Sequence, residues 1–173
     1  MFATIYLPNF YLQAALRHQE ELAQKPIGLI DGAEKKAVII QINPTAEEAG
    51  VRIGMTPSQG LARSLDLIIK VRSQAAEKIL QDVLLDFAGT LSPYVEATGP
   101  GLATVQFTDM NHVAAKVRRV VDQLEQTDVT AQAGVAPTPD ASFLAANLAR
   151  PVLQIDNATK FLAELPIEVL ALG

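Results

Sequence analysis

Ser92–Asp109 reads SPYVEATGPGLATVQFTD, and this stretch decides the fold. Two short β-rich runs, Tyr94–Thr98 and Leu102–Thr108, flank the turn cluster Gly99-Pro100-Gly101, a pattern typical of a β-hairpin. Alternate residues of the second run fall on opposite faces. One face is apolar and should be buried: Ala103, Val105 and Phe107. The other, called the working face below, carries no carboxylate: Leu102, Thr104, Gln106 and Thr108.

Two amphipathic helices flank this hairpin in the sequence. Ser73–Ala88 and Asn111–Gln126 both place apolar residues at helical spacing. Their apolar stripes should cover one face of a sheet formed by the hairpin and two further β-rich runs, Phe2–Leu7 and Val129–Val135. The predicted fold class is therefore α+β, with a mostly antiparallel sheet and two long helices on one face.

Residues 26–72 have a different organisation and predict a smaller inserted lobe. A polar turn, Gly32–Lys36, separates the β-rich runs Ile27–Asp31 and Ala37–Ile42. Two short helices, Thr45–Ala49 and roughly Pro57–Ser64, then precede a third β-rich run, Leu67–Val71. Gly50 and Gly54 lie close enough together to suggest a backbone with positive φ. We expect three segments: 1–25 and 73–173 in the main domain, and 26–72 in the lobe.

Composition excludes several classes of protein. The chain has 173 residues, is 49% hydrophobic and lacks cysteine, which excludes disulfides and thiolate metal sites and fits a reducing cytoplasm. No secretory leader is recognisable, and no apolar run approaches the ~18 residues of a membrane span. The net charge of −5 is the opposite of what a strong DNA-binding domain usually carries.

The residues alone show no active site. His18 and His112 are far apart and are interpreted as solvated, and Glu47-Glu48 as an exposed helix face. Asp31 and Asp66 lie at strand ends, where an acid usually forms a turn. We therefore expect no metal, no cofactor and no small-molecule substrate.

Four motifs in order resemble the palm and fingers of the Y-family (UmuC/DinB-like) translesion DNA polymerases. The first strand is followed by Asn9-Phe10-Tyr11, where the family has an aromatic pair. Thr45–Met55 is similar to the fingers motif YEARxxGVRxGM, and Ser92–Glu96 is similar to SPxVE. Gly134–Pro151 is similar to the GIAPN…AKP segment. The resemblance implies a ferredoxin-like palm, a fingers lobe at 26–72, and a 73–173 segment ending in the linker to an absent thumb and little finger.

The departures from the family pattern concern its catalytic positions. The resemblance places the metal-binding positions at Tyr6, Pro8, Gly101 and Leu102. It places the triphosphate-binding positions at Tyr11, Pro44, Glu47 and Phe143. None of these residues has the side chain that the family uses for metal or phosphate, except that Tyr11 fits the position that screens against ribonucleotides. The pattern is most like that of the inactive ImuB-type branch.

This resemblance implies a cytoplasmic, non-catalytic adaptor in DNA repair and translesion synthesis, within the SOS response. Its partners would be proteins of a translesion polymerase assembly, with DNA bound only weakly. Two alternatives remain open. The chain could be an active nucleotidyltransferase with displaced carboxylates, for which Asp31, Asp66 and Asp109 are the candidates. It could also be a ferredoxin-like binding module unrelated to DNA.

Overall fold

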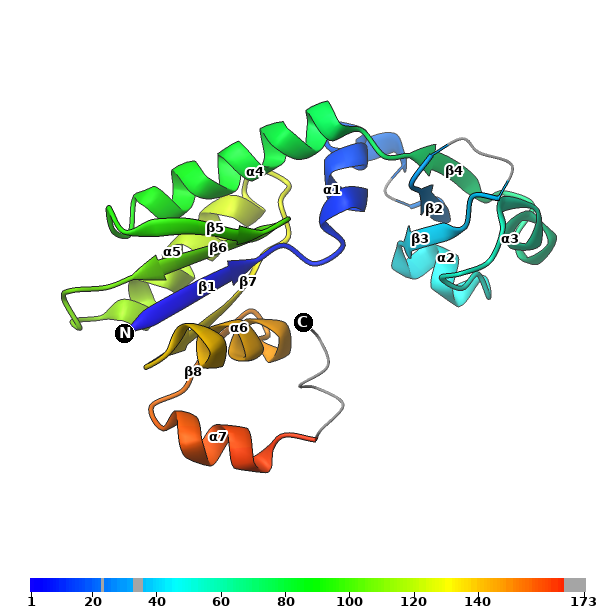
Figure 1. Ribbon diagram of the computed structural model, residues 1–173. Coiled ribbons are helices and arrows are strands. Elements are labelled where there is room, and N and C mark those ends of the chain that lie inside the picture. Colours follow the sequence, from blue (N-terminus) through cyan, green and yellow to red (C-terminus); the bar gives the residue numbers. More distant parts are fainter. Residues whose placement is uncertain (23, 33–35, 167–173) are drawn as a thin grey trace. The chain divides into compact units, whose positions relative to one another are not determined.

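The computed structural model describes residues 1–22, 24–32 and 36–166, which fall into two compact units (Figure 1). The first unit comprises Met1–Pro8 and Gln81–Gly173, and the second comprises Asn9–Leu80. The boundaries predicted from the sequence differ, because residues 9–25 and 73–80 group with the 26–72 segment. The last seven residues of the predicted 73–173 segment lie outside the described residues.

The first unit is built on a five-stranded sheet in the order β5-β6-β1-β7-β8. All neighbouring strands pair antiparallel except β7 and β8, which are parallel. The strands are β1 Phe2–Tyr6, β5 Val95–Gly99, β6 Leu102–Gln106, β7 Gln132–Ala136 and β8 Val152–Gln154. The predicted α+β class and the pairing of the hairpin with the N-terminal strand are therefore confirmed.

The hairpin between β5 and β6 is tighter than predicted. Gly99 belongs to β5 and pairs with Leu102, so that Pro100 and Gly101 alone form the turn. Gly101 has φ 69°, which a residue with a side chain adopts only with strain. A register shift between Glu96 and Gly99 marks a bulge in β5. The predicted apolar face of β6 is buried, as expected.

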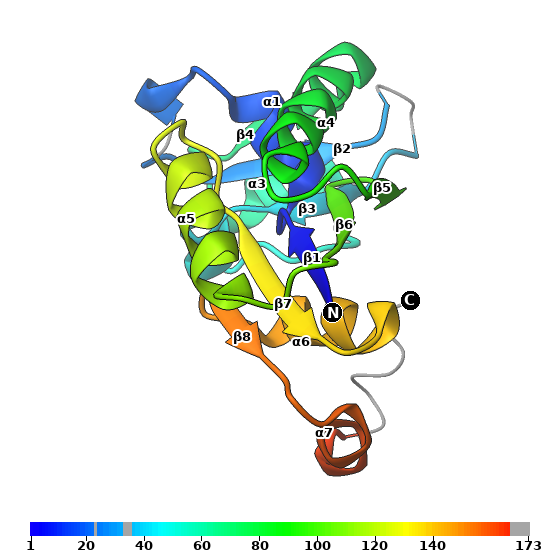
Figure 2. The same ribbon diagram turned by 90° about the vertical axis from the view of Figure 1, so that its left-hand side faces the viewer.

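Helices cover both faces of this sheet (Figures 1 and 2). The second half of α4 (Gln74–Gly89) and α5 (Val113–Glu125) lie on the face predicted for them. On the other face, α6 (Pro139–Leu148) packs against β7 and β1, and α7 (Ala158–Glu164) follows β8. Thr138 caps α6 by accepting the Ala141 amide at 3.3 Å, and Pro139 occupies the first helical turn.

The second unit has a three-stranded sheet in the order β3-β2-β4, with β2 antiparallel to β3 and parallel to β4. Its strands are β2 Ile27–Ile30, β3 Ile39–Ile42 and β4 Ile68–Val71. Its helices are α1 Phe10–Leu16, the 3₁₀ turn Glu20–Leu22, α2 Pro44–Glu48 and α3 Pro57–Arg63.

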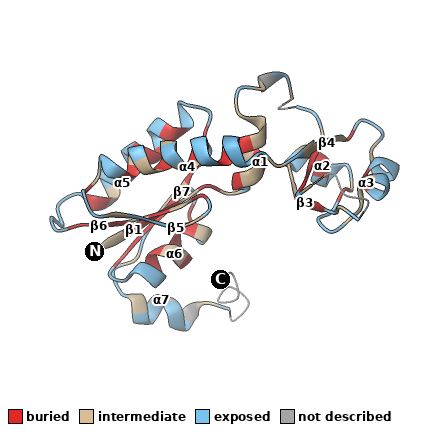
Figure 3. Ribbon diagram, turned by 45° about the horizontal axis from the view of Figure 1, so that its top comes forward, coloured by how far each residue is buried: buried red, intermediate tan, exposed pale blue. Residues whose placement is uncertain are grey.

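Apolar side chains on the two faces of β2 pack in two different clusters, and one of these clusters includes α1 in the second unit. Ile27 and Leu29 pack with Leu12 of α1, whereas Ile30 packs in a second cluster with Ile39. The buried strand β2 thus has an apolar partner on each face. In the first unit, β1 and β7 are mostly buried (Figure 3). Gly50 and Gly54 have φ of 86° and 88°, which confirms the positive φ predicted there. No helix of the described residues is both long and apolar enough to cross a bilayer.

Candidate functional site

The end of the β5–β6 hairpin brings together three of the four predicted metal-binding positions. Tyr6 of β1 lies directly opposite Leu102 of β6. The amide of Leu7 donates a hydrogen bond of 2.9 Å to the carbonyl of Gly101. Pro8, the fourth position, is the next residue after Leu7 in the chain. This cluster offers a phenol, an aliphatic side chain and no carboxylate.

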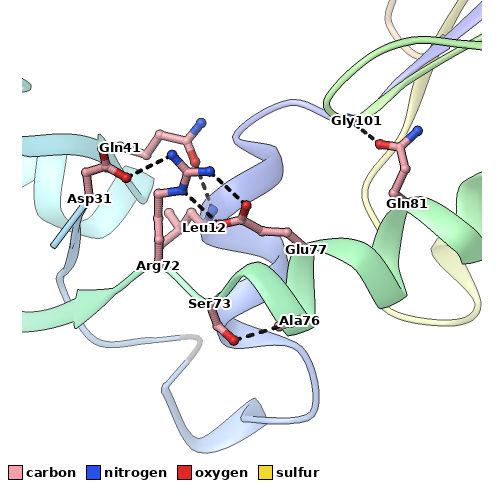
Figure 4. A network of polar contacts seen from close by, with 9 residues as sticks. All are labelled: Leu12, Asp31, Gln41, Arg72, Ser73, Ala76, Glu77, Gln81 and Gly101. Atoms are coloured by element: carbon pink, nitrogen blue, oxygen red, sulfur yellow. Dashed lines mark hydrogen bonds and ion pairs between the residues drawn. The ribbon is translucent and has the colours of Figure 1, made fainter.

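Gln81 closes the hairpin end from the side of α4 (Figure 4). Its Oε1 accepts the amide of Gly101 at 2.8 Å, and its Nε2 donates to the carbonyl of Leu102 at 3.3 Å. One side-chain amide thus binds the N–H group of the turn residue Gly101 and the carbonyl group of Leu102, the first residue of β6. Periodicity places Gln81 on α4 but gives no signal for this contact, which the sequence analysis missed.

A row of hydroxyl groups crosses the working face. Thr4 and Thr104 are cross-strand partners whose Oγ1 atoms lie 3.3 Å apart. Thr98 continues the row on β5, 3.1 Å from Thr104, and Ser142 of α6 continues it on the other side, 2.7 Å from Thr4. Ser142 also donates to the carbonyl of Pro139 at 2.7 Å. These hydroxyls bind one another, so the buried Thr4 and Ser142 are satisfied.

The five strands of this sheet carry one carboxylate among them, Glu96. The β6 residues of the working face have none, as predicted, but the pairing puts Glu96 opposite Thr104 and therefore on the same side. The three-residue turn predicted from the sequence pairs the same two residues, so the sequence was sufficient to place Glu96 on this face. Glu96 is exposed and stands without a second carboxylate on the strands.

Two of the three candidates for displaced catalytic carboxylates, Asp31 and Asp66, lie at opposite ends of the smaller sheet. Asp31 follows β2 and makes an ion pair of 2.8 Å with Arg72, whereas Asp66 precedes β4. Because β2 and β4 are parallel, the end of one is far from the start of the other. Asp31 and Asp66 are therefore not brought together.

Asp109, the third candidate acid, follows β6 in the first unit. Its carboxylate accepts the amide of Asn111 at 3.0 Å and lies 3.2 Å from the ammonium of Lys116. The hydrogen bond from Asn111 and then that from Lys116 lower the pKa of Asp109. Within the described part of the chain, no group of three or more His, Asp or Glu residues could hold a metal.

The predicted triphosphate-binding positions are divided between the units. Phe143 lies half-buried on α6 of the first unit, beside Ser142. Pro44 and Glu47 belong to α2 of the second unit, where Pro44 begins the helix and Glu47 is exposed. Glu47 lines a cavity of about 400 Å³ with Asn9, Ile42, Arg52 and Ile53. The residues at these three positions carry no cation.

Tyr11, the fourth position, is covered by an arginine. The guanidinium of Arg72 stacks 3.8 Å from the centre of the Tyr11 ring. Two hydrogen bonds of 2.8 Å join the same guanidinium to Glu77, and a third joins it to Asp31 (Figure 4). The hydrogen bond to Glu77 is the main reason that the pKa of Arg72 is raised. One face of Tyr11 therefore packs on Arg72.

Replacing Arg72 with alanine is expected to destabilise the protein by about 2 kcal/mol, because the nearly buried Glu77 carboxylate loses its bidentate partner. Asp31→Asn should cost less than about 0.5 kcal/mol, since Asp31 is 71% exposed. A double-mutant cycle with Glu77→Gln, followed by urea denaturation, measures the coupling. A coupling energy near zero would mean that the cluster does not stabilise the unit.

Comparison with known proteins agrees with this architecture. The model of the impB/mucB/samB family matches residues 5–147. DNA polymerase IV of Pseudomonas syringae pv. tomato (strain DC3000) is 28% identical over 174 residues, a match that covers 93% of this chain and 48% of that protein. DNA polymerase IV of Legionella pneumophila (strain Corby) is 26% identical over 175 residues, with the same coverage. The chain spans about half the length of these curated relatives.

Solved structures share the fold. The post-insertion binary complex of Dbh DNA polymerase superposes with a TM-score of 0.85 at 17% identity, over 97% of this chain and 52% of that chain. DinB from Sulfolobus solfataricus gives a TM-score of 0.82 at 17% identity, over 97% and 52%. The fold is therefore that of a Y-family palm and fingers. The family model covers most of the chain, and the chain belongs to the impB/mucB/samB family of Y-family polymerase domains.

Proposed function

We propose that this chain is a non-catalytic member of its family that serves as an adaptor or scaffold for a translesion DNA synthesis assembly in the cytoplasm. This assembly would act in DNA repair as part of the SOS response. The observation that carries the proposal is the cross-strand pair of Tyr6 and Leu102 at the hairpin end. These are two of the positions where the family resemblance expects metal-binding carboxylates.

The residues at the hairpin end do not fit catalytic magnesium. Two-metal phosphoryl transfer needs at least two converging carboxylates, because the metals lie about 4 Å apart. Magnesium in such sites is bound by one or two carboxylates and the substrate phosphates. Here the nearest strand carboxylate is the single Glu96, on the edge strand β5.

The charge at the fingers position also opposes nucleotide binding. Where the family uses an arginine for the triphosphate, this chain has Glu47, which is exposed on α2. The negative carboxylate would repel a triphosphate instead of binding it. Pro44 and Phe143 lack the hydroxyl and the ammonium of the family pattern. Loss of both metal and phosphate groups supports a role other than nucleotide transfer.

A second candidate is polymerase activity with displaced carboxylates. It is favoured by the names of the relatives, which are called DNA polymerase IV, and by the position of Glu96 on the working face. It needs a second carboxylate beside Glu96. Asp109 is paired with Lys116 after the end of β6, and Asp31 and Asp66 belong to the second unit. A module unrelated to DNA is not favoured, because the family match runs through both units.

Isothermal titration calorimetry with magnesium or manganese, with and without a deoxynucleoside triphosphate, tests the proposal. We expect no binding in the millimolar range or tighter for the metal-nucleotide complex. Metal-dependent nucleotide binding that is lost in Glu96→Gln would support displaced carboxylates. The matched control is Glu125→Gln, which removes the same charge from α5.

We also expect this chain to bind duplex DNA only weakly. Its net charge is −5, and DNA-binding affinity depends on cations that neutralise phosphates. A plot of log affinity against log salt should have a shallow slope, since each phosphate contact contributes roughly 0.9. Submicromolar binding at physiological salt, with a slope that implies several contacts, would contradict this expectation.

A further inference from the structure

The cations of the first unit are unevenly distributed. Residues 1–8 and 81–173 contain 5 basic and 11 acidic side chains. Three of the five basic residues lie within four consecutive positions of α5: Lys116, Arg118 and Arg119. An acidic unit that places most of its positive charge on one helix presents a local field opposite to that of the rest of its surface.

A groove lies beside these cations, between α5 and the end of α4. It has a volume of about 480 Å³ and is lined by Thr90, Leu91, Lys116, Arg119, Val120 and Gln123. Lys116, Arg119 and Gln123 are three or four residues apart and therefore form one stripe of α5. Val120 is 3% exposed and gives the groove an apolar floor. We call this feature the α5 groove.

The two cations of the α5 groove differ from their neighbour Arg118. Arg118 lies on another stripe and is paired with Asp122 at 3.2 Å, one helical turn away. Arg119 is exposed and makes no hydrogen bond or ion pair with any residue that the structure describes. Among the residues that the structure describes, Lys116 is paired with Asp109 alone, at 3.2 Å, and both side chains are about half exposed. The groove therefore has positive charge that a ligand can reach.

We propose that the α5 groove binds an acidic segment of a partner protein, with carboxylates on Lys116 and Arg119 and an apolar side chain against Leu91 and Val120. Charge complementarity and the apolar floor together favour a peptide. A nucleic-acid backbone would need a longer basic surface than the two cations of the groove provide. Helix α5 lies on the sheet face opposite α6 and the working face, so the proposal is independent of whether the sheet is catalytic (Figure 2).

The test uses a fluorescein-labelled peptide of glutamate and leucine, EELLEELLEE, and measures fluorescence anisotropy at about 150 mM salt. We expect saturable binding that Arg119→Glu and Lys116→Glu each weaken by roughly tenfold. The matched control is Arg118→Glu, which makes the same charge change on the same helix outside the groove and should change affinity less than about twofold. A peptide with glutamine in place of glutamate should bind at least about tenfold more weakly.

Three results would overturn the proposal. The first is the absence of saturable binding by the acidic peptide. The second is an equal loss of affinity in Arg118→Glu and Arg119→Glu, which would indicate a general charge effect. The third is a duplex DNA that binds more tightly than the peptide and depends on Arg119, which would make the groove a phosphate site. All substituted residues are exposed, so each variant is expected to fold. Circular dichroism of each variant shows whether unfolding causes a loss of affinity.

Discussion

Replacing Gly134 with alanine is expected to destabilise the protein by about 3 kcal/mol. Gly134 lies in β7 beneath α6, and an added Cβ would lie 2.7 Å from the carbonyl carbon of Ala145. It would lie closer still to the carbonyl oxygen of Ser142 and the amide of Ala146. These are backbone atoms of a helix, which cannot move aside as a flexible side chain can. The helix would have to shift away from the sheet.

Gly89→Ala is the matched control, because it makes the same substitution in the same unit where nothing lies within 4 Å of the added Cβ. Gly89 is the last residue of α4, so alanine should leave stability unchanged or raise it by up to about 1 kcal/mol. Urea denaturation of both variants measures the difference. Equal stability of the two variants would show that α6 does not pack on β7 as closely as described.

The second large effect is expected when carboxylates are placed at the hairpin end. In the double variant Tyr6→Asp, Leu102→Glu, two acids face each other across β1 and β6. Like charges directly opposite one another destabilise a sheet, and two half-buried apolar contacts are lost, so we expect a loss of about 2 kcal/mol. Manganese should restore part of this stability, because it binds the folded pair preferentially.

The neutral variant Tyr6→Asn, Leu102→Gln is its control and should not respond to manganese. Thermal unfolding with and without the metal measures the response. A rise in Tm in the neutral variant, or none in the acidic one, would contradict the described cross-strand geometry. Neither the double variant nor Leu102→Glu alone is expected to gain polymerase activity, because Glu47 and Phe143 would still leave the triphosphate without cations.

The sequence was sufficient to predict the sheet that contains the hairpin. Alternation in Leu102–Thr108 and the glycine-proline turn determine which face of β6 is buried, and both are local properties. The turn itself was predicted one residue too long. The position of Glu96 opposite Thr104 follows from the predicted three-residue turn, because a Thr98–Leu102 pair beside that turn places Glu96 opposite Thr104. The structure reaches the same pairing with a two-residue turn and a bulge in β5.

Contacts between residues that are far apart in the chain could not be predicted from the sequence. Helical periodicity indicates that α1 buries one side but not which sheet it contacts, and α1 packs on β2 in the second unit. The Arg72 cluster joins side chains from four places in the chain, and the contact of Gln81 with Gly101 spans 20 residues. Such contacts depend on tertiary packing, which a residue pattern does not contain.

Primer extension measures whether this chain transfers nucleotides. The chain is incubated with a primed template, deoxynucleoside triphosphates and magnesium or manganese, beside the aligned segment of the Pseudomonas DNA polymerase IV as a comparator of matched length. We expect no template-dependent addition by this chain under any condition, including those in which the comparator extends the primer. Any template-dependent extension by this chain would contradict this prediction. If that extension persists after Asp31, Asp66 and Asp109 are each replaced by alanine but is lost in Glu96→Gln, Glu96 is the carboxylate responsible.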